Sequence, residues 1–345
     1  MRVSPYAVGA VGGYAADLAI GDPGGAWHPV AVFGRAAGAV ERRLWRDRRD
    51  AGVLYAALCA GGVVAAAAAT SGAEFRDTTE KTSVVSLAGP RGFFRRRRST
   101  PPQRRRAAVA GGVVWAVLGG SSLRREALRI GDALAGGDLC RARELLPRLC
   151  GRDPQALSAQ EIARAVVESV AENTSDAVVG ALVWGALGGV PGLAGFRAVN
   201  TLDAMVGHRS ARYARFGWAA ARLDDVVGWP GARLTALLAA AAGPDAYGAL
   251  RAWRRDGGAH PSPNAGPVEA AFAGALGVRL GGPLAYGGRV EERPVLNGGG
   301  RAVGVHDIQR AVTLSGRVCH LALATTLAGH TVLRRRRLHH RKVRT

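Results

Sequence analysis

Residues 168–196 read ESVAENTSDAVVGALVWGALGGVPGLAGF, and the prediction of the fold starts from them. The stretch begins with the acids Glu168, Glu172 and Asp176 and continues into the uncharged run Ala177–Phe196. On a helix, positions i, i+4 and i+8 share one face, so the three carboxylates are predicted to lie side by side. Acids at this spacing repel one another, and beside an apolar segment they usually serve a cation, a proton or a charged substrate. The alternative is an acidic helix start, capped by Asn173 or Ser175, that complements the helix dipole.

Other uncharged runs extend the membrane interpretation to the whole chain of 345 residues. Ala51–Ala73 and Ala177–Phe196 are each long enough to cross about 30 Å of hydrocarbon. Three weaker candidates are Ala107–Leu123, Val318–Leu333 and, if Arg233 faces a protein interior, Val226–Pro244. We expect an all-α, polytopic integral membrane protein with polar helical segments between its spans. Almost no strand is expected, because no long stretch alternates with period two. The alternative is a soluble α protein that buries these helices.

The net charge of +21 is concentrated in the clusters Arg42–Arg49, Arg91–Arg106 and Arg334–Arg344. Nucleic-acid-binding proteins usually spread basic residues along one face with aromatic residues between them, and aromatic residues are only 6% of this chain. Here the clusters flank apolar runs, as expected of arginines that anchor a protein at a membrane. We therefore expect no nucleic acid as partner, but membrane lipids, a place in the cell (cytoplasmic) membrane, and a basic cytoplasmic tail at 334–345.

The chain is predicted to form a single membrane domain over residues 1–345. Its first apolar segment, Val3–Ala16, is expected to remain as a helix because no convincing signal-peptide cleavage site follows it. Residues 74–106 are polar, then rich in arginine, and carry Pro101-Pro102, so a disordered insertion is predicted there. The four cysteines have no CxxC spacing, which argues against a zinc site or a disulfide framework.

Polar motifs recur between the apolar runs. Ser158-Ala-Gln-Glu161 is a capping-box pattern that begins the helix carrying Glu168 and Glu172. No GxxxxGK[ST] motif is present, so any nucleotide would be bound without a P-loop. The other motifs are His28-Pro-Val, Asn200-Thr-Leu-Asp203, Arg222-Leu-Asp224-Asp225 and His260-Pro-Ser-Pro-Asn264.

In this order and at these separations, the motifs closely resemble those of the CobD/CbiB family of cobalamin biosynthesis. The resemblance covers most of residues 15–295. It rests on Gly21-Asp22-Pro23, His28-Pro29-Val30, Gly34, Gly151-Arg-Asp153, Val167–Asp176, Arg197–Met205, Tyr213, Phe216-Gly217, Ala221–Asp225, Pro230, Ala232–Ala236, His260–Asn264, Glu269-Ala-Ala and Ala273–Gly282. The chain departs from the family at residues 74–106, which replace a short connection, and at Gly266-Pro267-Val268, which lacks a tryptophan before the proline.

The resemblance implies an adenosylcobinamide-phosphate synthase of the bacterial inner membrane. Such an enzyme joins a carboxylate of the corrinoid adenosylcobyric acid to (R)-1-amino-2-propanol or its O-phosphate by an amide bond. Activation by ATP and Mg²⁺ is the chemical expectation, because a carboxylate and an amine do not condense unaided in water. Other cobalamin-pathway enzymes are possible partners.

Site residues follow from matching the motifs to this chemistry. Mg²⁺ prefers one or two carboxylates together with waters and phosphate oxygens, and a guanidinium matches the geometry of phosphate. Glu168 is the candidate base for the amine. The catalytic candidates are Glu168, Glu172, Asn173, Asp176 and Asp203. The candidate metal ligands are Asp176, Asp224 and Asp225, with Glu172 and Asp203 as further options. The candidate substrate-binding residues are His28, Asn200, Arg197, Arg209, Arg222, His260 and Asn264.

Two other classes of protein compete with this hypothesis. A non-catalytic membrane sensor of the distantly related AmpE type would not need Asp224-Asp225, His260–Asn264 and the full set of acids together. A basic nucleic-acid-binding protein would still bind DNA in a salt-sensitive way after removal of residues 91–106 and 334–345.

Overall fold

The computed structural model describes residues 4–25, 27–71, 103–208, 210–286 and 289–343. Helices dominate this part of the chain, and the strands β1 (Leu280–Tyr286) and β2 (Arg289–Leu296) form one antiparallel hairpin. In chain order the helices are α1 (Pro5–Ala19), α2 (Pro29–Leu44), α3 (Arg49–Ser71), α4 (Gln103–Val117), α5 (Gly120–Ala135), α6 (Leu139–Leu145), η2 (Leu146–Arg148), α7 (Ala159–Thr174), η3 (Ser175–Val179), α8 (Gly180–Leu202), η4 (Asp203–Gly207), α9 (Trp218–Ala242), α10 (Ala246–Asp256), α11 (Ala265–Leu276) and α12 (His306–Val343).

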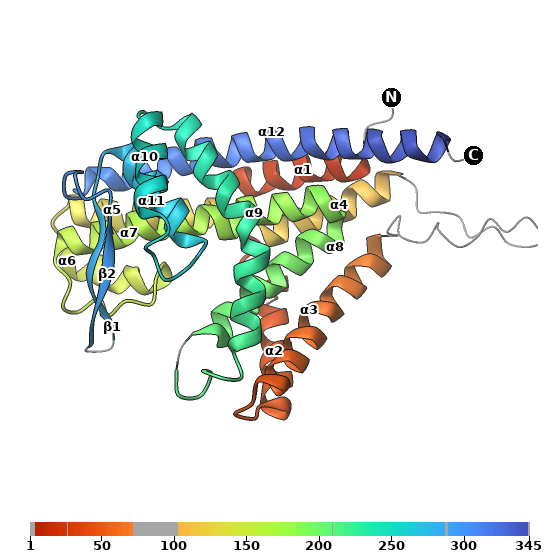
Figure 1. Cartoon of the computed structure of the whole chain (residues 1–345), viewed down its shortest axis with the longest axis horizontal. Coiled ribbons are helices and arrows are strands. Elements are labelled where there is room, and N and C mark those ends of the chain that lie inside the picture. Colours follow the sequence, from red (N-terminus) through yellow and green to blue (C-terminus); the bar gives the residue numbers. More distant parts are fainter. Residues whose placement is uncertain (1–3, 26, 72–102, 209, 287–288, 344–345) are drawn as a thin grey trace, which may run out of the picture.

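The long helix α12 runs the length of the molecule beside α1, and both chain termini lie at one end of the bundle (Figure 1). His330 fixes this end: its Nδ1–H donates to the carbonyl of Ala186, and the Ser4 hydroxyl donates to its Nε2, each at 2.9 Å. The opposite end carries α5, α6, α10 and the β-hairpin. The bundle therefore has a terminal end and a second end built from short helices and the hairpin.

Helices α1 and α4 run parallel in close contact because glycines on α1 leave room for the α4 backbone. A Cβ at Gly9 would meet the Ala107 carbonyl oxygen, and one at Gly13 would meet the Gly111 carbonyl oxygen. Small residues at such an interface let helices approach without side chains between them, as in membrane helix pairs. This contact places the start of α4 beside the start of α1, at the terminal end.

Residues 168–196 belong to one continuous helix that later reverses. Helix α7 passes without a break through the π-helical segment η3 into the first half of α8. At Gly189 the backbone adopts φ 64° and ψ −150°, a region open essentially to glycine alone. After Gly189 the chain doubles back, so a Cβ at Gly180 would meet the Phe196 ring and one at Gly192 would meet the Trp184 carbonyl oxygen. Helix α8 is therefore a helical hairpin.

Ala177–Phe196 is long enough to cross a membrane as a straight helix, but the reversal folds this run back on itself. In a straight helix, Asp176 and Arg197 would be separated by roughly 30 Å. In the hairpin both lie at its open end, where the Arg197 charge interacts with the Asp176 carboxylate. Sequence composition did not distinguish the two forms, because both halves of the hairpin are equally apolar.

Four described helical stretches are long and apolar enough to cross a membrane: Arg49–Ser71, Gln103–Ala135, Ala159–Gly207 and His306–Arg336. The third contains the reversal at Gly189. Large apolar side chains such as Val11, Leu58 and Leu321 are exposed on the surfaces of these helices and of α1. Apolar surface of this kind is expected to face lipid in a polytopic helical membrane protein.

Two features of the secondary structure differ from the sequence expectations. Residues 103–106, placed in the disordered insertion, form the first turn of α4, whereas residues 72–102 lie outside the described part. The β-hairpin at 280–296 was not expected, because Gly281, Gly282 and Pro294 interrupt any alternation of apolar residues. The predicted first apolar helix is confirmed as α1.

Gly189→Ala should destabilise the protein by about 1–3 kcal/mol, because a Cβ is strained at this φ and ψ. Thermal unfolding of the detergent-purified protein measures the effect. Gly188→Ala is the matched control: a Cβ there would have no described atom within 4 Å, so alanine should be neutral or slightly stabilising. Equal melting temperatures for the two variants would contradict the reversal at Gly189.

Candidate functional site

Four carboxylates from different elements converge at the open end of the α8 hairpin. The Asp176 carboxylate, in η3, interacts electrostatically with Glu172 of α7, Asp203 of η4 and Asp224 of α9. Glu172 and Asp203 also interact with each other. We call Glu172, Asp176, Asp203 and Asp224 the acidic cluster. The sequence placed the first two on one face of a helix, and the reversal at Gly189 adds the other two.

Three members of the acidic cluster differ from ordinary buried carboxylates in their bonding. No hydrogen bond or ion pair joins Glu172, Asp176 or Asp203 to any residue that the structure describes. The three side chains are half-buried, and carboxylates close together in such a place are unfavourable unless a cation or hydrogen-bond donors neutralise them. The cluster is therefore suited to a positively charged ligand.

The alternative interpretation of residues 168–176 as a capped helix start is wrong. The cap of α7 is Ser158, which forms a complete capping box with Glu161. Asn173 lies in the last turn of α7, where its amide donates to the Ser169 carbonyl at 2.9 Å. The acids therefore stand within a continuous helix, far from its N-terminal end, and the helix dipole does not explain them.

Glu168 differs from the acidic cluster because both of its oxygens are engaged. Oε2 is paired with Arg152, and Oε1 accepts from the Gly281 backbone N–H at 2.7 Å. Arg164, one turn earlier on α7, donates to the carbonyls of Gly281 and Pro283, both at 2.7 Å. These bonds fix the β-hairpin to α7. In this geometry Glu168 anchors the hairpin, and its role as a base stays a prediction.

A second group of buried side chains, His260 and Glu269, lies within electrostatic reach of Glu172. The His260 Nε2 is 4.0 Å from Glu269 Oε1 on α11 and 3.2 Å from Arg293 Nη1 on β2. Burial raises the pKa of Glu269 well above its ordinary value, and Glu168 and Glu172 add to the shift. The Ser262 N–H donates to His260 Nδ1 at 3.0 Å, which holds the His260–Asn264 turn in place.

Glu269, Arg152 and Arg293 were not among the predicted site residues. Glu269 and Arg152 belong to motifs that carry the family resemblance, so a signal for them was present. Arg293 follows Glu291-Glu292 in a segment with no such motif, and only the pairing of β2 with β1 brings it to the site.

His28 lies in a loop held against α4 and α5. Val30 N–H donates to His28 Nδ1 at 3.1 Å, so Nε2–H donates to Asp22 Oδ1 at 2.8 Å. Gly21 has φ +83°, and the Trp115 indole donates to its carbonyl at 2.7 Å. Arg197 interacts electrostatically with Asp22 as well as Asp176. The loop that carries His28 and Asp22 therefore borders the acidic cluster.

Asn200 of α8 and Asn264, the residue that precedes α11, both contact the start of α9. Asn200 Nδ2 lies 3.5 Å from Asp224 Oδ1, and Asn264 Nδ2 donates to the Asp225 carbonyl at 2.9 Å. The Asn264 contact requires Gly228, since a Cβ there would meet the Asn264 amide. Burial, with Asp203 as the next cause, raises the pKa of Asp224 to about 7.

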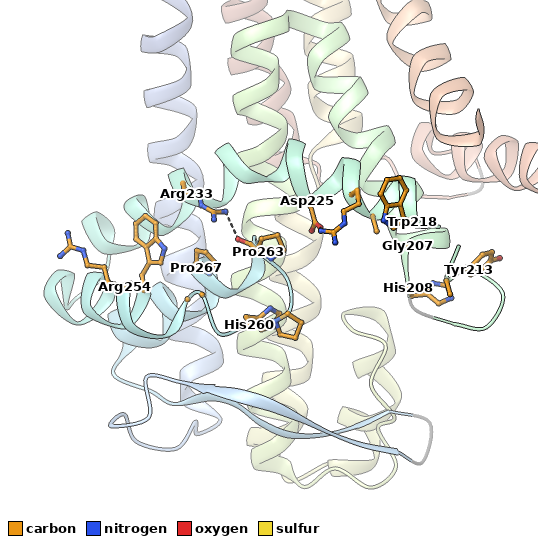
Figure 2. Close-up of a pocket in the computed structure, with 17 residues that line it drawn as sticks. Gly207, His208, Tyr213, Trp218, Asp225, Arg233, Arg254, His260, Pro263 and Pro267 are labelled. Atoms are coloured by element: carbon orange, nitrogen blue, oxygen red, sulfur yellow. Dashed lines mark hydrogen bonds and ion pairs between the residues drawn. The ribbon is translucent and has the colours of Figure 1, made fainter. Parts of the chain in front are cut away.

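A cleft of about 710 Å³ opens beside this part of α9 (Figure 2). One wall consists of Gly207, His208, Tyr213, Ala214 and the start of α9, and α10 with residues 257–267 forms the other. Asp225 and His260 both line the cleft, so it adjoins the acidic cluster on α9 and the Glu269 group on α11. Its volume is typical of small-molecule sites.

The donor set fits Mg²⁺ bound together with phosphate better than a metal held by protein alone. Among the described residues, no three His, Cys, Asp or Glu side chains form a group that could hold a metal ion. Mg²⁺ commonly uses one or two carboxylates plus phosphate oxygens, and Asp176, Asp224 or Asp225 could supply the carboxylates. The metal assignment stays a prediction. Arg222 lines the cleft, and the predicted Arg209 lies outside the described residues.

Comparisons with known proteins agree with these features. A family model described as CobD/Cbib protein matches residues 10–315. A relative from Mycobacterium tuberculosis named cobalamin biosynthesis protein CobD is 48% identical over 96% of this chain and 97% of its own length. A relative of the same name from Geobacter metallireducens is 41% identical over 81% of this chain and 83% of its own length. Another from Sinorhizobium fredii is 36% identical over 90% of this chain and 91% of its own length. No solved structure matched the chain.

Folding stability should fall as the pH rises from about 5 to 8, and Glu269→Gln should reduce this fall. Because the pKa of Glu269 is raised in the folded state, the folded protein keeps a proton that the unfolded chain loses above its ordinary pKa of 4.5. That contribution to stability is complete below pH 4.5 and is lost as the pH rises. Melting temperatures across this range test it.

The exposed Glu144, paired with Arg141 on the surface, provides the control. Glu144→Gln should retain the wild-type pH dependence. A slope in Glu269→Gln as steep as that of the wild type would show that Glu269 is ionised in the folded protein.

Proposed function

The chain belongs to the CobD/CbiB family and acts in cobalamin biosynthesis, and on this basis we propose that it is an ATP-dependent amide ligase. Its substrates are adenosylcobyric acid and (R)-1-amino-2-propanol or the O-phosphate of that amine, and its product is adenosylcobinamide or its phosphate. The carboxylates of the acidic cluster, brought together beside the cleft, support this proposal. A non-catalytic sensor would gain nothing from several carboxylates that bond no other described residue.

Amide formation requires the amine to lose a proton, because an ammonium nitrogen has no lone pair for attack. Glu172 is the best candidate to accept this proton, since no described residue binds its carboxylate. Glu168 is less suitable, because Arg152 and the Gly281 N–H already hold both of its oxygens. The positive charge of the incoming ammonium also favours its binding at the acidic cluster.

ATP supplies the activating phosphoryl group when bound, and Mg²⁺ neutralises its charge. Asp176, Asp224 and Asp225 would hold the metal, and Arg197, which interacts with Asp22 and Asp176, would orient an anionic group of the substrate. The corrinoid is too large for the cleft alone, so its reacting carboxylate is expected to enter beside the cleft, over the acidic cluster.

Glu172→Gln and Asp176→Asn should each lower the ligation rate by roughly 10²-fold or more, because each removes one charge and keeps the shape of the side chain. The assay uses membranes that contain the protein, adenosylcobyric acid, ATP, Mg²⁺ and each amine, with product quantified by chromatography. Protein levels in the membrane should be unchanged, because these acids hold no described partner in place.

Glu144→Gln removes an equivalent charge from the surface and should leave the rate unchanged. Wild-type turnover in both Glu172→Gln and Asp176→Asn would contradict the assignment of this helix and favour Asp203, Asp224 and Asp225 instead. Absence of turnover by the wild-type protein with either amine would contradict the ligase activity itself.

The acidic cluster and the C-terminal tail lie toward opposite ends of α12. Thr174, beside the cluster, bonds Ser315, whereas Ser4 and Ala186 bond His330 roughly 22 Å further along the helix. If α12 crosses the membrane, the site and the arginines at the end of α12, such as Arg334 and Arg336, face opposite sides. The site must be cytoplasmic to reach ATP, whereas the arginines of the tail predict a cytoplasmic tail, and both cannot hold. We therefore propose that the site is cytoplasmic and that the tail is on the other side.

Labelling with a membrane-impermeant maleimide should therefore distinguish the two ends. Cys140 is exposed on α6 at the site end, and Arg336→Cys supplies a reporter at the terminal end. In right-side-out vesicles Arg336→Cys should react and Cys140 should not, with the opposite result in inside-out vesicles; Cys140→Ser identifies its signal. Reaction of both on the same side would show that α12 does not cross the membrane.

A further inference from the structure

The charged residues that line the cleft are mainly cationic. Arg222, Arg233 and Arg254 contribute guanidinium groups, and Asp225 is the one carboxylate among the described lining residues. A corrinoid that offers one carboxylate for amidation does not call for three arginines. Phosphate groups carry more charge and suit the planar fork of a guanidinium.

Arg233 is held ready to bind an anion. Its Nη1 donates to the Pro263 carbonyl at 2.8 Å and to Asn264 Oδ1 at 3.0 Å, as Figure 2 shows for Pro263. Its guanidinium also lies over the Trp229 ring, 4.7 Å from the centroid. No described residue accepts a hydrogen bond from Nε or Nη2. The side chain is therefore fixed along one edge, which lowers the entropy lost when a ligand binds the other.

The other two arginines approach the cleft from different helices. Arg222 of α9 has one weak contact, with Asp225 Oδ2 at 3.4 Å, and its side chain is 66% exposed. Arg254 is exposed on α10 and makes no hydrogen bond to a described residue. Trp253 and Trp218 add flat apolar surface to the lining. A ligand with both anionic and planar or apolar parts matches these walls.

Carboxylates that could share a Mg²⁺ ion with phosphate also lie at the cleft. Asp225 lines it, and Asp224, the preceding residue, belongs to the acidic cluster. Phosphate oxygens near Arg222 would lie beside the carboxylates proposed for Mg²⁺, and Mg²⁺ is usually shared between protein carboxylates and phosphate. Cationic and acidic groups that line one cavity are thus suited to one ligand that carries both phosphate and a bound cation.

We propose that this cleft is the subsite for the phosphate groups of a substrate, bound by Arg222, Arg233 and Arg254. The inference rests on the proposed ligase function and adds the position at which phosphate binds. Two substrates of that reaction carry phosphate, namely ATP and the O-phosphate of the amino alcohol. Their shared chemistry is the phosphoryl anion, and binding measurements distinguish them.

The test uses the full-length protein in detergent, with calorimetric titration of a non-hydrolysable ATP analogue, of aminopropanol O-phosphate and of unphosphorylated aminopropanol. Arg254→Ala and Arg222→Ala should each weaken binding of a phosphate-bearing ligand by roughly tenfold, the loss expected for one charge-assisted hydrogen bond. Unphosphorylated aminopropanol should bind these variants as it binds the wild type. If the variants weaken binding of the nucleotide alone, the cleft binds ATP. If they weaken binding of aminopropanol O-phosphate alone, the cleft binds the phosphorylated amine.

One matched control lies on α10 and the other shortly before α9. Arg251→Ala removes an arginine three residues from Arg254 that does not line the cleft, and Arg215→Ala removes an exposed arginine before α9. Both should bind as the wild type does. Arg233→Lys keeps the positive charge but removes the planar guanidinium, so it should weaken phosphate binding. An unchanged melting temperature would show that the turn at Asn264 is preserved.

Equal affinity in Arg254→Ala, Arg222→Ala and the controls would overturn the proposal, as would absence of binding by both phosphate-bearing ligands. Turnover measured in parallel separates this result from failure of the proposed function. Cobinamide formation with unchanged KM for ATP and amine in the cleft variants would reject the subsite and retain the ligase. Phosphate binding that depends on Arg254, without cobinamide formation, would retain the subsite and reject the ligase.

Discussion

The site forms because the chain reverses at Gly189. The reversal returns an apolar helix toward its starting point, so the segment before Asp176 and the segment after Arg197 share one end of the bundle. Asp203 and helix α9 follow directly from the returning half, and their carboxylates meet Glu172 and Asp176 as a result. Only glycine tolerates the backbone conformation at this turn, and Gly180 and Gly192 allow the two halves to touch.

The acids at the open end of the α8 hairpin are of two kinds, which differ in whether other residues bind their carboxylates. Glu168 is buried, paired with Arg152 and bonded to the hairpin backbone, so its charge stabilises the structure. Glu172, Asp176 and Asp203 have no such bonds to the described residues. A protein accepts this unfavourable arrangement where a ligand supplies the missing positive charge. The distinction between an anchoring carboxylate and a ligand-binding carboxylate thus follows from the hydrogen bonds of each.

The hairpin β1–β2 connects the anchoring carboxylate Glu168 with the residues around His260. Its Gly281 backbone is bonded to Glu168 and Arg164 on α7, and its second strand brings Arg293 to His260. A change in the hairpin would therefore shift both the anchor and the cationic residue near Glu172. The hairpin lies at the end of the bundle opposite the chain termini (Figure 1).

Local spacing and motifs along the chain were enough to predict the helical class, the apolar segments, the capping box at Ser158 and the family. They also placed Glu172 and Asp176 on one helical face, since only the helical period is needed for that. They did not identify the α8 hairpin, because Gly-Gly-Val-Pro-Gly is compatible with a kinked span as well as a reversal. Which acids are paired and which are not depends on the tertiary structure, since Arg152 and the Gly281 N–H approach Glu168 from distant parts of the chain. Arg293 reaches the site only through strand pairing, a long-range contact that no local pattern encodes.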